Sequence, residues 1–284
     1  MTNYNPASSK LTAKEVIAIA IIGIISGGIF SLLGLAIGQN LISAEILISL
    51  DQNITQLVAD FRSPELIQVF IWITTLGVWQ LATPLLAASI VMLIVLRRSL
   101  LILPLLVSSL GGTAFSILGK LAFQRPRPAE AVLFEHSYAF PSSHATTAIA
   151  FYGFLGYLLI RSVSGWQQRI TLFFITGLAV ILLGLSRIIL GVHYLSDILA
   201  GYLVGGFWLI IAIGLTEWLI AGDKVSMPNN IDVKSRARSR LLAVGALAYV
   251  ASFILIYQPV YTTTLQTAVV QLNNPIGPLP ALKK

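Results

Sequence analysis

Long apolar runs separated by short polar segments dominate the chain. They lie at 16–38, 66–96, 99–123, 142–161, 170–190, 196–221 and 241–258. Lipid offers no hydrogen-bond partner to the backbone, so a chain crosses a bilayer as a helix of roughly 20 mostly apolar residues. The pattern predicts an all-α, polytopic transmembrane bundle with six spans and a seventh at 241–258. That last run is short, so lying along the interface or outside the main bundle is its alternative.

The first run, 16–38, is too long for a signal-peptide core and lacks a clear small-residue cleavage site, which predicts a retained signal anchor. In the following segment, 39–65, apolar residues recur at three- and four-residue intervals, with Asp51, Gln52 and Asp60 between them. This spacing predicts an amphipathic helix on the membrane surface. We interpret it as a solvated connector resting on the bilayer, with the screening of a lipid entrance as the alternative.

The composition supports a membrane protein. Of 284 residues, 56% are hydrophobic and only 10% are charged, whereas soluble domains average about 25% charged residues. The net charge is +7, but the cations are scattered between apolar runs, so we expect no nucleic-acid partner. The absence of cysteine excludes disulfides, thiolate metal sites and a cysteine nucleophile.

The distribution of Lys and Arg predicts the orientation. With a cytoplasmic N-terminus, eleven cations fall inside: Lys10, Lys14, Arg97, Arg98, Arg161, Arg169, Lys224, Lys234, Arg236, Arg238 and Arg240. Seven fall outside: Arg62, Lys120, Arg125, Arg127, Arg187, Lys283 and Lys284. The layout is then a cytoplasmic tail at 1–14, a membrane domain at 15–221, a basic cytoplasmic loop at 222–240, a span at 241–258 and a non-cytoplasmic tail at 259–284.

Three short sequences concentrate the unusual polar residues at the outer ends of predicted spans. They are KLAFQRPRP at 120–128, PSSH at 141–144, and Ser186-Arg187 followed by His193 and Asp197. A charge at the bilayer centre costs on the order of 2.5–3.5 kcal/mol even on the lenient insertion scale. These residues must therefore share an interfacial or water-filled cavity, which makes them functional candidates.

Three cations of these sequences suit a dianionic phosphate. Lys120 and Arg127 are seven residues apart, two turns if the segment stays helical, so both can face one anion. Arg187 adds a third cation from another span. Guanidinium groups match phosphate oxygens in bidentate fashion, and lysine adds a point charge. The alternative for each cation alone is snorkelling to the lipid headgroups.

The PSSH sequence predicts a helix start. Pro141 fits the first helical position, where its missing N–H costs nothing. The free N–H groups of Ser142, Ser143 and His144 then point out of the helix and form a phosphate cradle. A plain helix start without a ligand is the alternative.

His193 and Asp197 are four residues apart, so they share one helical face. The carboxylate can bind one ring nitrogen, fix the tautomer and leave the other nitrogen to attack phosphorus. His144 would then act as general acid toward the leaving oxygen and as base toward water. No metal or other cofactor is required, and a zinc site is disfavoured because three cations would lie beside it.

In their order and spacing, the three motifs resemble the type 2 phosphatidic acid phosphatase (PAP2) superfamily of membrane lipid phosphatases. The motifs span 120–197, and a six-span layout extends the likeness over about 15–221. The resemblance implies that His193 is the nucleophile, Asp197 orients it and His144 protonates the leaving group. It also implies phosphate binding by Lys120, Arg127, Ser142, the Ser143 backbone and Arg187. The family commonly has glycine where this chain has Ser143.

The expected activity is therefore hydrolysis of a lipid phosphomonoester or diphosphate through a phosphohistidine, at the non-cytoplasmic face of a bacterial inner membrane. Undecaprenyl diphosphate, phosphatidate and phosphatidylglycerophosphate are the candidate substrates, and the partners are this lipid and the bilayer. One alternative is a lipid phosphotransferase. Another is a non-catalytic transporter or binder of anionic lipid, which predicts symmetric repeats of broken helices and leaves the His193–Asp197 spacing unexplained.

Several charged residues fall outside the motifs. Arg125, Glu130, Glu135 and His136 are predicted to lie in a solvated outer loop, with contact to a headgroup as the alternative. Glu217 is predicted to snorkel, and the basic stretch 234–240 has topogenesis as its simplest account.

Overall fold

The computed structural model describes residues 42–133, 135–222, 225 and 243–256, and throughout these ranges the regular elements are helices. Five segments are long and apolar enough to cross a membrane: Pro64–Val95, Ser99–Phe123, Ser143–Ser162, Trp166–Ile189 and Leu195–Ala221. They confirm five of the predicted spans and the all-α fold class. The predicted span at 16–38 and the tails at 1–14 and 259–284 lie outside the described residues.

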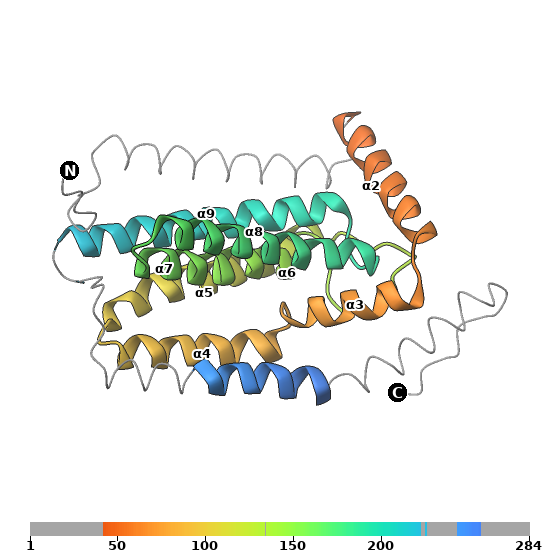
Figure 1. Cartoon of the computed structure of the whole chain (residues 1–284). Coiled ribbons are helices and arrows are strands. Elements are labelled where there is room, and N and C mark those ends of the chain that lie inside the picture. The colour runs from red at the N-terminus through yellow and green to blue at the C-terminus, as the bar shows by residue number, and fades with distance from the viewer. Residues whose placement is uncertain (1–41, 134, 223–224, 226–242, 257–284) are drawn as a thin grey trace.

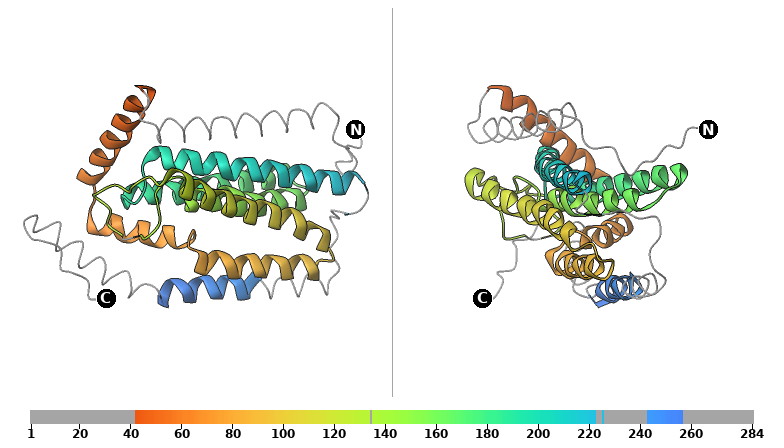
Figure 2. Two further views of the ribbon diagram at one scale, coloured as in Figure 1. Left: turned by 180° about the vertical axis from the view of Figure 1, so that it is seen from behind. Right: turned by 90° about the vertical axis from the view of Figure 1, so that its left-hand side faces the viewer.

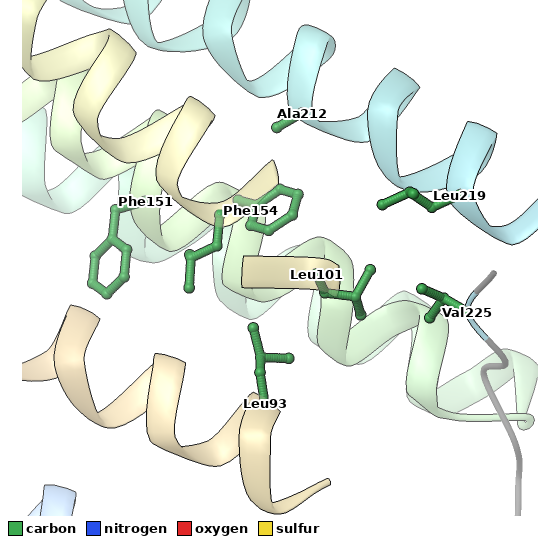
Figure 3. Packing of buried hydrophobic residues seen from close by; sticks show 8 residues of the cluster. Leu93, Leu101, Phe151, Phe154, Ala212, Leu219 and Val225 are labelled. Carbon is green, nitrogen blue, oxygen red and sulfur yellow. The ribbon is translucent and has the colours of Figure 1, made fainter. Parts of the chain in front are cut away.

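The spans form one bundle (Figure 1). Helix α5 (Ile102–Phe123), which follows a 3₁₀ turn at Ser99–Leu101, packs along α9 (Leu195–Ala221), and α8 (Trp166–Ile189) contacts α7 (Phe154–Ser162). Figure 3 shows the largest described apolar cluster, which consists of Leu93, Leu101, Leu105, Phe151, Phe154, Ala212, Leu219 and Val225. Its members come from α5, α7 and α9 and from chain segments next to them, and none comes from α8. Large apolar side chains such as Phe173 and Phe174 remain exposed on α8, as expected for a surface that faces lipid.

The span Pro64–Val95 is broken, whereas the sequence predicted one continuous run. It consists of α3 (Pro64–Thr75) and α4 (Trp79–Val95), which are visibly offset in Figure 1. The Tyr152 hydroxyl donates a hydrogen bond to the Leu76 carbonyl at the break. A Cβ atom on Gly77 would lie only 2.3 Å from Cδ2 of His144. The break therefore needs glycine because its backbone packs directly on the His144 ring.

The third span begins as α6 (Ser143–Thr147), continues through a π-helical segment at Ala148–Gly153 and ends as α7. π-Helical turns leave helix carbonyls without their usual partners. Here the Ser108 hydroxyl of α5 donates to the Ala150 carbonyl at 2.6 Å. This bond fixes the span that carries His144 against α5.

Helix α2 (Ile42–Asp60) lies across one end of the bundle (Figures 1 and 2). The predicted helix is present, but its interpretation as a solvated connector is wrong. Its apolar residues Ile46 and Leu57 are exposed, whereas Asp51 and Thr55 are buried against the bundle. The side of α2 that packs on the protein thus carries the polar residues Asp51 and Thr55 together with Ile54 and Val58, and α2 contacts α8 and the start of α9.

The apolar helix Ala243–Ile256 is shorter than a full span. It runs alongside α4 in Figure 2, and the Tyr249 hydroxyl donates to the Gln80 carbonyl at 2.9 Å. The described part of the predicted run at 241–258 thus lies at the edge of the bundle. Near the end of α9, Glu217 pairs with Arg161 at 2.9 Å and accepts a hydrogen bond from Tyr157. Glu217 joins α9 to α7, so its interpretation as a snorkelling residue is wrong.

Candidate active site

The predicted site residues all lie at the end of the bundle that α2 crosses (Figure 1). They come from the end of α5, the loop that follows it, the start of α6, the end of α8 and the start of α9. Five chain segments that are distant in sequence thus supply one cluster of charged and polar groups.

The turn between α8 and α9 carries His193. After α8 ends, Gly191 adopts a left-handed conformation with a φ of 67°, which favours glycine. The Val192 N–H returns to the Arg187 carbonyl at 3.1 Å. The Val192 carbonyl accepts from Arg127 Nη1 at 2.6 Å. This turn fixes the backbone immediately before His193.

His193 lies between a cation and a carboxylate. Its Nε2 atom is 3.2 Å from Arg127 Nη1, and its Nδ1 atom is 3.4 Å from Asp197 Oδ2. The prediction that His193 and Asp197 share a helical face is wrong, because α9 begins at Leu195 with Tyr194 as its N-cap. Asp197 Oδ2 instead accepts the Tyr194 N–H at 2.9 Å, which aims the carboxylate back toward the ring.

These contacts define the tautomer of His193. A guanidinium can only donate, so the Nε2 atom that faces Arg127 is the unprotonated nitrogen. A carboxylate can only accept, so Nδ1 carries the hydrogen that faces Asp197. The free electron pair of the ring is therefore on Nε2, beside the cations.

Burial lowers the pKa of His193 well below the ordinary value of histidine. The nearby groups Arg127, Arg187, Lys120 and His144 lower this pKa further. The imidazole is therefore neutral at neutral pH and keeps its electron pair. These four groups therefore lie close enough to His193 to act on its charge.

Two arginines hold a single carboxylate. Arg127 Nη2 lies 2.7 Å from Glu135 Oε2, and Arg187 Nη2 contacts Glu135 Oε1. Arg187 is almost fully buried and also donates to Thr74 Oγ1 at 2.7 Å. The prediction that Glu135 is a solvated loop residue is therefore wrong: its two oxygens bridge two of the proposed phosphate ligands.

The other cation, Lys120, is buried near the end of α5, and its Nζ donates to the Tyr138 carbonyl. The chain does not stay helical from Lys120 to Arg127, because Gln124 ends α5 in a left-handed conformation with a φ of 45°. Arg127 therefore reaches the site from a loop. Burial, partly offset by Asp197, lowers the pKa of Arg127 to about 10, so this residue stays charged.

The PSSH sequence does begin a helix, but two residues later than predicted. Ser142 is the N-cap of α6, and its hydroxyl accepts from the Ala145 N–H at 3.5 Å. The Ser142 N–H donates to the Asp197 carbonyl at 3.0 Å, so it is not a free member of the predicted cradle. The N–H groups of Ser143 and His144 occupy the first helical positions, where no acceptor within the helix exists.

Ser143 is helical, so the glycine of the family motif is not required here by the backbone conformation. Its hydroxyl lies 3.0 Å from Ser116 Oγ of α5. His144 Nε2 is buried, and no group in the described part of the chain forms a hydrogen bond with it. A buried ring nitrogen without a protein partner is suited to a bound ligand.

Sequence reasoning missed a second buried cluster beside His193. Arg125 Nη1 pairs with Asp197 Oδ1 at 2.5 Å, and its Nη2 pairs with Asp51 Oδ2 at 2.8 Å. The prediction that Arg125 lies in a solvated loop is thus wrong. One signal was available: Asp51 and Thr55, four residues apart, place polar groups on a single face of a largely apolar helix.

Comparisons with known proteins show what this chain is similar to. Residues 101–220 match the family model of the PAP2 superfamily. Phosphatidylglycerophosphatase B of Bacillus subtilis (strain 168) is 29% identical over 191 residues, which cover 66% of this chain and 91% of that protein.

One solved structure has a similar fold. The crystal structure of the first transmembrane PAP2 type phosphatidylglycerolphosphate phosphatase from Bacillus subtilis has a TM-score of 0.62 and 27% sequence identity, covering 69% of this chain and 96% of that chain. Aquifex aeolicus LpxE has a TM-score of 0.45 and 26% identity, covering 57% of this chain and 93% of that chain. The first of these neighbours shares the membrane bundle described above. Over residues 101–220 the chain is therefore similar to the PAP2 superfamily, and its relatives support a phosphoric monoester hydrolase embedded in a membrane.

Proposed function

We propose that this protein hydrolyses a lipid phosphomonoester through a covalent phosphohistidine on His193. The observation that carries this proposal is the neutral His193 ring, with its free Nε2 beside Arg127 and its Nδ1 facing Asp197. A buried neutral imidazole with an oriented partner is an activated nucleophile. The names of the relatives favour a headgroup of the phosphatidylglycerophosphate type. Phosphatidate is also a phosphomonoester. Undecaprenyl diphosphate would present its terminal phosphoryl group to the same site, with the lipid monophosphate as leaving group.

The proposed reaction has two displacements at phosphorus. In the first, Nε2 of His193 forms a bond to phosphorus while the bond from phosphorus to the lipid oxygen breaks. His144 gives a proton to that leaving oxygen. In the second, water attacks phosphorus, His144 takes its proton, and the bond from nitrogen to phosphorus breaks. The products are the lipid alcohol and phosphate, and both histidines return to their starting state.

Lys120, Arg127 and Arg187 are proposed to hold the phosphoryl oxygens, with the N–H groups at the start of α6. Charge spreads over these oxygens in the transition state, so preorganised cations in a buried site stabilise it. Glu135 bridges Arg127 and Arg187, so its carboxylate competes with phosphate for these two guanidinium groups. Binding of a phosphate dianion at these two guanidinium groups requires Glu135 to move away.

We propose that the site faces the non-cytoplasmic side of a bacterial inner membrane and that the N-terminus is cytoplasmic. The support is the distribution of Lys and Arg: eleven lie in the segments assigned to the cytoplasm and seven in those assigned to the other side. Arg97 and Arg161 lie at the bundle end opposite to that of His193, as this orientation requires.

The first prediction concerns the reaction class. Purified protein should release inorganic phosphate from a panel of phosphatidylglycerophosphate, phosphatidate and undecaprenyl diphosphate, with turnover unchanged in excess chelator. Product analysis of the same samples tests the alternative, because a phosphotransferase yields a phosphorylated acceptor lipid in place of free phosphate. A strict requirement for a divalent metal would contradict the proposal.

The second prediction concerns Glu135. Replacing it with glutamine keeps the shape of the side chain but removes the charge that competes for Arg127 and Arg187. Inorganic phosphate should then inhibit lipid hydrolysis with an inhibition constant about tenfold lower, which corresponds to about 1.4 kcal/mol. Glu130 is an exposed residue of the same loop. Glu130→Gln is therefore the matched control and should leave the inhibition constant of phosphate unchanged. An unchanged or higher constant for Glu135→Gln would show that this carboxylate does not compete with phosphate.

A further inference from the structure

Helix α2 carries a buried carboxylate that the reaction above does not use. Asp51 is only 1% exposed, although its helical neighbours Leu50 and Gln52 are exposed. A buried carboxylate is costly unless charged or hydrogen-bonding groups compensate it. The partners of Asp51 therefore indicate why it is there.

Asp51 has two partners, both next to the proposed catalytic groups. Its Oδ1 accepts the Ser196 N–H at 3.0 Å, and its Oδ2 accepts the Ser196 hydroxyl at 2.5 Å. Oδ2 also pairs with Arg125 Nη2 at 2.8 Å. Ser196 lies in the first turn of α9, directly before Asp197. The carboxylate of α2 thus binds the helix start that carries the orienting residue of the nucleophile.

Arg125 connects the two carboxylates. Its Nη1 pairs with Asp197 Oδ1 at 2.5 Å and donates to Ser196 Oγ at 2.7 Å. The Tyr194 ring covers the guanidinium, with a distance of 4.2 Å from Arg125 Cζ to the ring centroid. Burial alone would lower the pKa of Arg125, but Asp197 and Asp51 outweigh it and raise the pKa. Arg125 therefore stays positively charged.

The two oxygens of Asp197 have different partners. Arg125 binds only Oδ1, which leaves Oδ2 for the Tyr194 N–H and His193 Nδ1. A guanidinium prefers to bind both oxygens of one carboxylate in a fork. Asp51 occupies Nη2 of Arg125, and this contact prevents the fork from closing on Asp197.

We propose that Asp51 and Arg125 are positioning residues, which hold Asp197 so that its Oδ2 faces the nucleophile. This inference rests on the proposed roles of His193 and Asp197. Without the Asp51 charge, Arg125 turns both nitrogens toward Asp197 and draws Oδ2 away from His193. The His193 ring then loses its orientation and part of its basicity, whereas the cations that bind phosphate are untouched.

The test is Asp51→Asn in the full-length purified protein. We expect kcat to fall by about 10- to 100-fold, the usual cost of removing a group that orients a catalytic residue. The KM of the lipid and the inhibition constant of inorganic phosphate should each stay within about twofold. Asp60→Asn makes the same charge change at an exposed position of α2 and should leave kcat unchanged.

A second comparison separates positioning from a general structural effect. In an Asp197→Asn background, Asp51→Asn should cause no further loss of the residual turnover, because Asp51 acts only through Asp197. If Asp51→Asn does not yield folded protein, Ser196→Ala removes only the hydroxyl that Asp51 and Arg125 share. We then expect a smaller loss of kcat, about threefold to tenfold, with phosphate inhibition unchanged.

Two results would overturn the inference. One is a wild-type kcat in Asp51→Asn, or in Ser196→Ala where that variant replaces it. The other is an equal loss in the wild-type and Asp197→Asn backgrounds. Either result, together with an inactive His193→Ala, would leave the proposed function intact. Full turnover in His193→Ala would reject the proposed function itself.

Discussion

Replacing His193 with alanine is expected to lower phosphate release by about 10⁴-fold or more, for every lipid that the protein hydrolyses. The residue supplies the bonding electron pair, and removing a nucleophile costs about as much as removing a whole catalytic unit. His193 is buried, and its Nε2 lies 3.2 Å from Arg127. The substitution leaves Arg127 and the other cations in place, so they should still bind phosphate. The expected loss is therefore in kcat, with the inhibition constant of inorganic phosphate nearly unchanged.

The chain offers a matched control for this substitution. It has three histidines, and His136 is an exposed residue of the loop between α5 and α6, next to Glu135 in sequence. His136→Ala should keep normal turnover, which shows that loss of an imidazole at this end of the bundle is not harmful in itself. Folded His193→Ala with normal phosphate release would reject the assigned nucleophile.

The second large effect is expected for His144→Gln. General acid catalysis contributes about 10²- to 10⁴-fold, and this contribution depends on how much the leaving oxygen needs a proton. Release of phosphate from a lipid, whose alkoxide is a poor leaving group, should fall by that factor. Release from an aryl phosphate such as p-nitrophenyl phosphate should fall far less, because its phenolate leaves without a proton.

The comparison of the two substrates distinguishes the two histidines. His193→Ala removes the attacking atom, so it should abolish hydrolysis of the lipid and of the aryl phosphate alike. Equal losses for both substrates in His144→Gln would instead indicate that His144 acts in binding or in the structure. The buried, unpartnered Nε2 and the close packing of Gly77 on the ring indicate a fixed position for His144.

Much of the fold could be predicted from the sequence, because a backbone that crosses lipid must satisfy its hydrogen bonds within a helix. Five described spans follow the apolar runs closely, since an uninterrupted helix is what a backbone in lipid requires. The break at Gly77 could not be predicted in this way. It depends on tertiary contacts with Tyr152 and His144, and the run around it is apolar throughout.

The motif residues could be singled out from sequence, because charged groups at the ends of apolar spans are costly and the three motifs resemble a known family in order and spacing. Their catalytic roles stay predictions. Their local conformations differed from expectation where a helix end intervened. Asp197 reaches His193 through the N-cap of α9, and Arg127 lies in a loop after a left-handed Gln124. Spacing alone assumes a continuous helix, so it misses such ends.

The supporting charges could not be predicted, because their partners are distant in the chain. Asp51 pairs with Arg125 across 74 residues, and Glu135 pairs with Arg187 across 52. In sequence, Asp51 and Thr55 mark polar positions on one face of a helix and Glu135 a charged position in a loop, but the partner of neither carboxylate can be recognised. Only the packing of α2 and of the loop between α5 and α6 on the bundle brings them to the proposed site.

The most direct test of the covalent mechanism is rapid quenching of the protein with lipid labelled with ³²P in the phosphate. The quench is alkaline because phosphohistidine survives alkali and is lost in acid. The mechanism predicts a transient label that peaks before free phosphate accumulates, maps to the peptide containing His193 and is missing in His193→Ala. Phosphate release with no protein-bound label, while the same quench preserves a phosphohistidine standard and samples are taken within one turnover, would contradict it.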